Sequence, residues 1–219
     1  MPTAYIFCPS YILNKNKINI PKNSGDIFIA ADSGIETAVK LNIKVNILMG
    51  DFDSIACGED FEKYNYNIED IKMIKYPAIK DDTDSMLAVK YALESGYKNI
   101  TIIGGLDGRI DHTLANLYLL KYIKIHGGVG CITNGYNKIT YLADSTVKIC
   151  KEYKYVSVMP VSRELIGVTL KGFKYNLENA AVKFEEPYTV CNEIPENSEY
   201  GEIYIAYGEA LICECDDMI

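Results

Sequence analysis

Acidic residues gather at four places in the first half of the sequence, each directly after a short apolar run. The four stretches are ADSG (residues 31–34), GDFDS (50–54), KDDTD (80–84) and GGLDGRIDH (104–112). Any one of them could be an ordinary solvated turn, because Asp and Gly are common turn residues. In an open parallel sheet, however, ligands bind beyond the carboxyl ends of the strands. Four such stretches at one sheet edge therefore favour a binding site.

The pair Asp51 and Asp53 indicates the chemistry of this site. In an extended chain, residues two apart face the same way, so both carboxylates would face the ligand while Phe52 packs behind them. Two carboxylates this close repel each other unless a cation lies between them. Oxygen ligands favour Mg²⁺, whose coordination is usually completed by water and substrate phosphates. The pair therefore predicts a magnesium site and a phosphorylated substrate, most simply a nucleotide.

A phosphate group also needs hydrogen-bond donors. Lys80, Thr83, Arg109 and the backbone N–H groups around Gly104-Gly105 and Gly108 can supply them. Alternatively, Thr83, Asp82 or Ser85 could cap the second expected helix, and Asp111 could cap the third. His112, at the start of an expected helix, is interpreted as structural. The chain has neither GxxxxGK[ST] nor GxGxxG, so it indicates neither a P-loop NTPase nor a typical dinucleotide enzyme.

The first half alternates strand-like and helical patterns. Helices are expected over 35–41, 85–94 and from 111 or 112 to just before Gly127, and Ser33 to Glu36 has the form of a capping box. This alternation predicts an α/β fold with a doubly wound, mainly parallel sheet and helices on both faces. After about Thr133, short runs separated by turn residues, YTVCNEI (188–194) among them, predict a smaller all-β sandwich or barrel. We expect two domains, residues 1–130 and 131–219.

Composition narrows the class of protein. The 219 residues are 48% hydrophobic and 24% charged, which is typical of a globular protein, and the net charge of −8 disfavours nucleic acid as a partner. Seven scattered cysteines without a CxxC pair indicate reduced thiols rather than zinc ligands. The chain shows no signal-peptide pattern and no apolar segment of about 18 residues. We therefore expect a cytoplasmic protein without a membrane partner.

The ordered motifs resemble a known family. ADSG, GDFDS, KDDTD and GGLDGRIDHTLANL (104–117), in this order, resemble the motifs of thiamine pyrophosphokinase, also called thiamine diphosphokinase. The later GVTLKGFKYNL (167–177) and TVCNEI (189–194) resemble the thiamine-binding domain of that family. Together these motifs span most of the chain.

The resemblance implies a fold, a reaction and an assembly. It implies an N-terminal α/β domain that binds ATP and Mg²⁺, and a C-terminal sandwich that binds thiamine. The reaction transfers the terminal pyrophosphate of ATP to the hydroxyl of thiamine, which gives thiamine diphosphate and AMP. The family works as a homodimer, with each active site shared between two subunits.

The resemblance also implies residue roles. It assigns Asp51, Asp53 and Asp81 as magnesium ligands, and Asp84 and Asp111 to the acidic site around them. ATP contacts are implied for Asp32, Ser33, Lys80, Thr83, Gly105, Arg109 and Asn116. Lys80 and Arg109 would stabilise the developing charge, and one of Asp51, Asp81 and Asp111 would accept the alcohol proton. Cys191, where the family usually has Ser, and Asn192 would contact thiamine.

Three other functions stay open at the level of the motifs. A nucleotide-sugar glycosyltransferase also uses an Asp-x-Asp metal site after a strand. A phosphatase could use Asp51 as its nucleophile and Asp53 as its acid. A non-catalytic nucleotide-binding protein would bind ATP and release no AMP. The last two clusters, KDDTD and GGLDGRIDH, favour pyrophosphoryl transfer over the glycosyltransferase.

Overall fold

The computed structural model describes residues 1–52, 71–77 and 81–218, and the predicted site residues Asp53 and Lys80 lie outside these ranges. The chain divides into two compact units, Met1–Gly135 and Tyr136–Ile219. The expected division after residue 130 would cut a strand, β6, that belongs to the first unit. No helix of the described residues is long and apolar enough to cross a membrane.

The first unit contains a parallel sheet with the strand order β4-β3-β2-β1-β5-β6. Its strands are β1 (Thr3–Phe7), β2 (Ile27–Ala31), β3 (Ile47–Gly50), β4 (Lys72–Lys75), β5 (Asn99–Ile103) and β6 (Val129–Thr133). The chain moves outward from β1 to β4 and then returns to place β5 beside β1. The direction of winding therefore reverses between β1 and β5, the position where doubly wound sheets bind their ligands.

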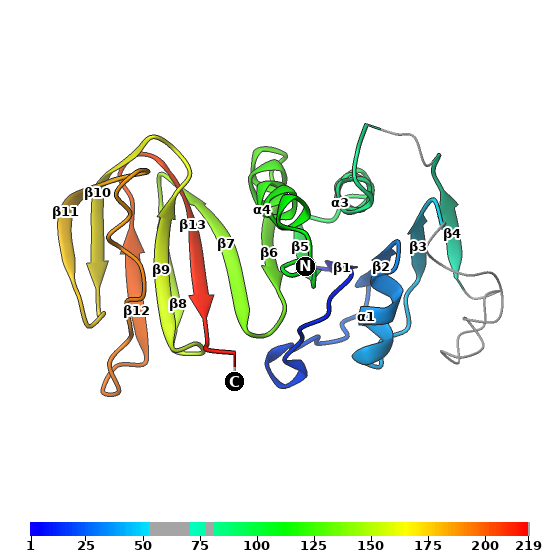
Figure 1. Cartoon of the computed structure of the whole chain (residues 1–219), viewed down its shortest axis with the longest axis horizontal. Coiled ribbons are helices and arrows are strands. Elements are labelled where there is room, and N and C mark those ends of the chain that lie inside the picture. The colour runs from blue at the N-terminus through cyan, green and yellow to red at the C-terminus, as the bar shows by residue number, and fades with distance from the viewer. Residues whose placement is uncertain (53–70, 78–80, 219) are drawn as a thin grey trace. The chain divides into compact units, whose positions relative to one another are not determined.

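Helices cover both faces of this sheet, as predicted (Figure 1). The helical elements are a 3-10 turn, η1 (Lys15–Lys17), and the α-helices α1 (Gly34–Lys40), α3 (Asp84–Glu94) and α4 (Ile110–Ile125). Ile35 and Ala38 of α1 pack in one apolar cluster with Phe7 and Leu48. The buried residues Ala88 and Val89 of α3 belong to the opposite face, where α3 also contacts α4.

The helix starts differ from the predicted capping. Ser33 stands at the N-cap of α1 but makes no side-chain cap hydrogen bond, because its backbone (φ −63°, ψ 2°) is not extended. The N-cap residue of α4 is Arg109, so Asp111 lies inside the first turn and does not cap it. Thr83 does cap α3, because its Oγ1 accepts a 3.2 Å hydrogen bond from the N–H of Met86.

Gly34 explains why glycine follows Asp32-Ser33. A Cβ atom at this position would lie 1.9 Å from the carbonyl oxygen of Phe7, the last residue of β1. The start of α1 therefore packs directly on the backbone at the end of β1, which only glycine allows.

The second unit is a sandwich of two antiparallel sheets, ordered β7-β13-β9 and β11-β10-β12-β8. Its strands are β7 (Asn137–Ala143), β8 (Thr146–Cys150), β9 (Tyr155–Pro160), β10 (Glu164–Lys171), β11 (Leu177–Lys183), β12 (Tyr200–Tyr204) and β13 (Glu209–Cys215). Both sheets contribute to one core, with Val158 and Ile212 from the first and Leu165 and Ile203 from the second. The predicted all-β sandwich is confirmed, although residues 188–194 form an isolated bridge between Asn192 and Val156 rather than a strand.

Candidate active site

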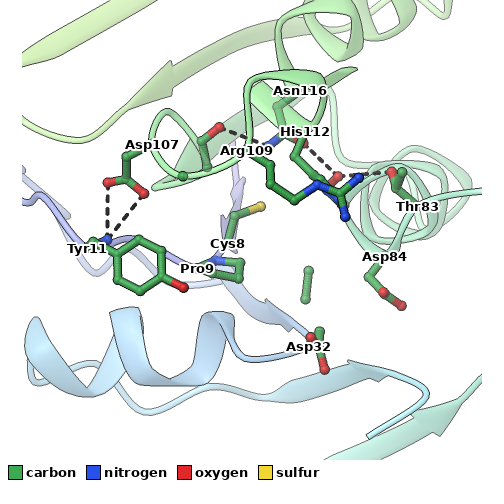
Figure 2. A pocket seen from close by; sticks show the side chains of 14 residues that line it. Cys8, Pro9, Tyr11, Asp32, Thr83, Asp84, Asp107, Arg109, His112 and Asn116 are labelled. Carbon is green, nitrogen blue, oxygen red and sulfur yellow. Dashed lines mark hydrogen bonds between the residues drawn. The ribbon is translucent and has the colours of Figure 1, made fainter. Parts of the chain in front are cut away.

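A pocket of about 480 Å³ lies in the first unit where the winding reverses. Its walls come from the segments that follow β1, β2 and β5 and from the first turns of α3 and α4 (Figure 2). Six sequence-predicted site residues line it: Asp32, Thr83, Asp84, Gly105, Arg109 and Asn116. Residues far apart in the chain thus meet at one edge of the sheet, as the motif positions indicated.

Two carboxylates, those of Asp32 and Asp84, lie at one end of this pocket, and we call them the acidic end. Asp32 follows β2 in a left-handed conformation (φ 49°), and its N–H donates a 2.7 Å hydrogen bond to the carbonyl of Met49. Asp84 opens α3, where a negative charge interacts favourably with the helix dipole. Both backbones are thus fixed by regular structure, so the acidic end is held in place before any ligand binds.

The expected extended backbone through Phe52 is wrong. Strand β3 ends at Gly50, and Phe52 adopts a left-handed conformation (φ 63°), so strand alternation does not govern where Asp51 and Asp53 point. Phe52 does pack against the apolar cluster that contains α1. Asp51 is half-buried and is not among the residues that line the pocket, although it follows Gly50, which packs on the backbone of Asp32.

Arg109 and Asp111 form an ion pair on the surface. The Nε of Arg109 donates a 3.1 Å hydrogen bond to Oδ1 of Asp111, and both side chains are largely exposed. The guanidinium holds the pKa of the Asp111 carboxyl below its usual value, and the carboxylate raises the pKa of Arg109. Arg109 lines the pocket, whereas Asp111 is not among the lining residues and contacts Arg109 instead.

Asn116 joins two walls of the pocket. This buried side chain donates from Nδ2 to the carbonyl of Gly105 (3.0 Å), and its Oδ1 accepts from Ser85 Oγ (2.7 Å). The N–H groups of Gly104 and Gly105 donate to the carbonyls of Thr133 and Pro9. These two N–H groups brace the loop after β5 instead of serving as phosphate donors, which corrects that expectation.

Three other acidic or polar motif residues lie outside the pocket lining. Ser33 stands at the start of α1, and Asp81 is exposed. The carboxylate of Asp82 forms a 2.5 Å ion pair with Lys90 on α3. Within KDDTD, therefore, Thr83 and Asp84 face the pocket while Asp82 ties the segment to its own helix.

Sequence reasoning missed the wall of the pocket that follows β1. Cys8, Pro9 and Tyr11 line the pocket, together with Asp107 from the loop after β5. Burial raises the pKa of the Cys8 thiol to about 12, so the thiol stays protonated and cannot serve as a nucleophile. The segment CPSY (8–11) carries no local motif, because its place in the site depends on contacts with residues near position 107.

The donors at the acidic end suit a hard cation such as Mg²⁺, because they are carboxylate oxygens. Within residues 1–52, 71–77 and 81–218, no three His, Cys, Asp or Glu side chains form a metal cluster by themselves. Magnesium usually takes one or two carboxylates and completes its shell with water and phosphates, so Asp32 and Asp84 fit this mode of binding.

The predicted thiamine contacts lie in the second unit. The buried amide of Asn192 accepts from the N–H of Tyr175 (3.0 Å) and donates to the Tyr175 carbonyl (2.7 Å). Cys191 is exposed with φ 58°, and its N–H donates to Ser157 Oγ at 3.0 Å. Asn192 therefore holds the exposed Tyr175 in place, and the neighbouring Cys191 is exposed as well.

Each of the two units matches a domain of known proteins. Residues 21–128 match the family model of the thiamin pyrophosphokinase catalytic domain, and residues 144–206 match that of its vitamin B1 binding domain. The chain is 33% identical to thiamine pyrophosphokinase of Bacillus subtilis over 173 residues, which cover 77% of this chain and 78% of that protein. It is 25% identical to thiamin pyrophosphokinase 1 of Caenorhabditis elegans over 191 residues, covering 78% and 73% of the two chains.

Solved structures agree with these matches. A crystal structure of thiamine pyrophosphokinase from Bacillus subtilis superimposes with a TM-score of 0.85 at 26% identity, covering 99% of this chain and 100% of that one. One from Geobacillus thermodenitrificans gives a TM-score of 0.81 at 26% identity, covering 99% and 98%. By its two domains, its sequence and its fold, the chain belongs to the thiamine pyrophosphokinase family.

Proposed function

We propose that the pocket of the first unit binds ATP and that residues around it drive transfer of the pyrophosphate of ATP to thiamine. Members of this family are thiamine diphosphokinases, with ATP and thiamine as substrates. The observation that carries the proposal is the pocket itself. Six predicted site residues line it, within the unit that matches the catalytic domain.

The reaction makes and breaks one bond to phosphorus. The hydroxyl oxygen of thiamine attacks the β-phosphorus of ATP, and the bond from that phosphorus to the oxygen shared with the α-phosphate breaks. AMP leaves, and the alcohol proton passes to an acceptor. In such transfers the protein contributes mainly positioning and charge stabilisation.

Each role falls to a residue of this chain. Arg109 at the pocket wall would stabilise the charge that develops on the phosphate oxygens, together with Lys80. Thr83 and the turn at Gly105 would shape the part of the pocket that holds the phosphates. Asn116 would hold that turn in place through its hydrogen bond to the Gly105 carbonyl. One of Asp51, Asp81 and Asp111 would accept the alcohol proton, with Asp51 favoured because it follows Gly50, which packs on the backbone of Asp32.

Magnesium fits the same end of the pocket. Asp51, Asp53 and Asp81 would hold the ion as the family motifs imply, and Asp32 and Asp84 add carboxylates at the pocket wall. A bound Mg²⁺ would neutralise charge on the phosphates of ATP.

We further propose that the protein is a cytoplasmic homodimer in which thiamine binds near Cys191 and Asn192 of the partner subunit. The match of residues 144–206 to a vitamin B1 binding domain supports the second unit as the thiamine side. Sedimentation equilibrium of the purified chain tests the assembly, and a monomer at the concentrations used for activity would contradict it.

The decisive assay combines purified protein with ATP, MgCl₂ and thiamine and quantifies AMP and thiamine diphosphate. Wild type should form both in equal amounts, whereas Asp51→Asn should lower the rate by about 100-fold or more, as expected when a metal ligand or catalytic base is lost. Asp217→Asn, an exposed acid paired with Lys154, is the matched control and should keep full activity. Full turnover by Asp51→Asn would remove that residue from the mechanism.

The same assay separates the alternatives. A sugar transferase would release a nucleoside diphosphate from a nucleotide sugar, and a phosphatase would release inorganic phosphate without thiamine. A non-catalytic nucleotide binder would retain ATP unchanged. The two family domains favour none of these three outcomes.

A further inference from the structure

Tyr11 stands out among the pocket residues because it is aromatic, 83% exposed and fixed at the pocket wall. Its ring lies against Gly108, where a Cβ atom, if the residue had one, would lie 3.5 Å from the ring atom Cε2. Single exposed aromatics are common on protein surfaces and by themselves mean little. Tyr11 differs from such residues because hydrogen bonds to Asp107 hold its backbone at the pocket wall.

One carboxylate fixes the segment that carries Tyr11. Asp107 accepts hydrogen bonds from Ser10 Oγ (2.9 Å), from the N–H of Tyr11 (3.1 Å) and from the N–H of Ile12 (2.9 Å). Lys40 on α1 donates a 2.8 Å hydrogen bond to the carbonyl of Ser10. The loop after β1 is therefore held by the loop after β5 and by α1, although Tyr11 itself is exposed.

This arrangement divides the pocket into two ends. In Figure 2, Tyr11 and Asp107 lie on one side of the cavity, while Thr83 and Asp84 lie on the other. The acidic end suits phosphates and their cation, whereas a rigid phenol ring suits the face of a planar heterocycle. A nucleotide carries both groups at opposite ends.

We propose that Tyr11 stacks on the adenine base of the donor nucleotide, and that Asp107 is the positioning residue that presents it. The proposal rests on the proposed function, because it assumes that the pocket binds ATP. The glycine at 108 is required by its backbone, since its φ of 85° disfavours any side chain, and a Cβ atom there would lie at van der Waals distance from the ring.

The test compares ATP with inorganic tripolyphosphate, which keeps the charged phosphate chain and lacks the base. Equilibrium binding of both, with MgCl₂, is measured by calorimetry for wild type, Tyr11→Ala and Tyr11→Phe. Tyr118→Ala is the matched control, an exposed tyrosine of α4 outside the pocket lining. Tyr11→Ala should weaken ATP binding by about tenfold, the usual effect of losing one stacked base. Its affinity for tripolyphosphate should stay within about twofold of the wild-type value. Tyr11→Phe should bind both as wild type does.

Asp107→Asn tests the positioning role. It should weaken ATP binding by about fivefold through loss of the fixed loop, again without an effect on tripolyphosphate. The double variant Tyr11→Ala/Asp107→Asn should bind ATP no more weakly than Tyr11→Ala, because both changes remove the same contact. Additive losses would overturn the positioning role.

The outcomes separate this inference from the function on which it rests. If wild type binds ATP and forms AMP while Tyr11→Ala binds ATP normally, the stacking proposal is wrong and the function stands. Equal weakening of ATP and tripolyphosphate by Tyr11→Ala would also overturn stacking, because the loss would then not depend on the base. If wild type neither binds ATP nor forms AMP, both proposals fail together.

Discussion

The acidic end and the tyrosine end of the pocket are built in different ways. Asp32 and Asp84 lie directly where β2 ends and α3 begins, so regular structure within a few residues fixes them. Tyr11 lies in a loop and is held by Asp107, which is 96 residues away in the sequence. The sequence motifs contain both acids of the first end, but at the second end they contain Asp107 and not Tyr11. The difference shows that a short sequence motif reveals a site residue when residues next to it in the chain fix its position.

The largest expected effect lies at the acidic end, where a substitution, unlike Tyr11→Ala, should weaken the binding of ATP and of tripolyphosphate alike. Asp84→Asn should lower the rate of AMP formation by about 100-fold or more, because it removes a carboxylate from the phosphate end. Binding of ATP and tripolyphosphate with MgCl₂ should weaken by the same factor. Calorimetry and the AMP assay measure both. A loss confined to ATP would mean that the two ends are not separate.

Asn116 lies between the two ends, so its loss should affect both. Asn116→Ala removes the hydrogen bonds that this side chain makes to the Gly105 carbonyl and the Ser85 hydroxyl, and should lower the free energy of unfolding by about 2 kcal/mol. Urea unfolding measures this change, and calorimetry should show weaker binding of ATP and tripolyphosphate alike. Asn46→Ala is a suitable control, because Asn46 also binds the backbone through its side-chain amide, accepting from the N–H of Phe28, but before β3 and outside the pocket lining. Wild-type binding by Asn116→Ala would show that the turn holds its shape without this side chain.

The smallest expected effect on folding stability concerns the exposed ion pair of Arg109 and Asp111. The pKa of Asp111 is lowered in the folded protein, so the pair is fully formed above the usual pKa of an aspartate and is lost only as pH falls through the lowered value. Arg109→Gln should return the Asp111 pKa to the ordinary range, as followed by carboxyl carbon NMR during an acid titration. Unfolding at neutral pH should not change measurably, because exposed ion pairs contribute little. An Asp111 titration that is the same in both proteins would show that the pair does not form in solution.

Prediction from sequence succeeded where local patterns determine structure. Alternating strand and helix patterns identified the doubly wound sheet, and Thr83 was correctly considered as a helix cap. It failed where the backbone leaves regular structure. The left-handed turn at Phe52 invalidated the argument from strand alternation, and the unextended Ser33 could not complete a capping box. Both failures lie at the ends of elements, where tertiary contacts outweigh local preference.

In the second unit, too, prediction from sequence identified the fold and failed for one segment. Its short alternating runs predicted a sandwich, and the shared core of the two sheets confirmed it. The segment 188–194 also looked like a strand, yet it forms one bridge to Val156 while Asn192 uses its amide to hold Tyr175. Side-chain hydrogen bonding there replaces the ladder that the apolar pattern suggested.

The sequence by itself determined the fold class and the residues at the ends of the strands, because hydrophobic periodicity and chain direction are local properties. The ordered motifs also pointed to the family. Only the tertiary structure decided which of those residues share a pocket, why Asn116 is buried between two walls and why Tyr11 stands opposite the acids. Those relations depend on contacts between β1, β5 and their loops, about 100 residues apart in the sequence. Such contacts leave no periodic trace in the chain, since they form only when the sheet brings its strand ends together.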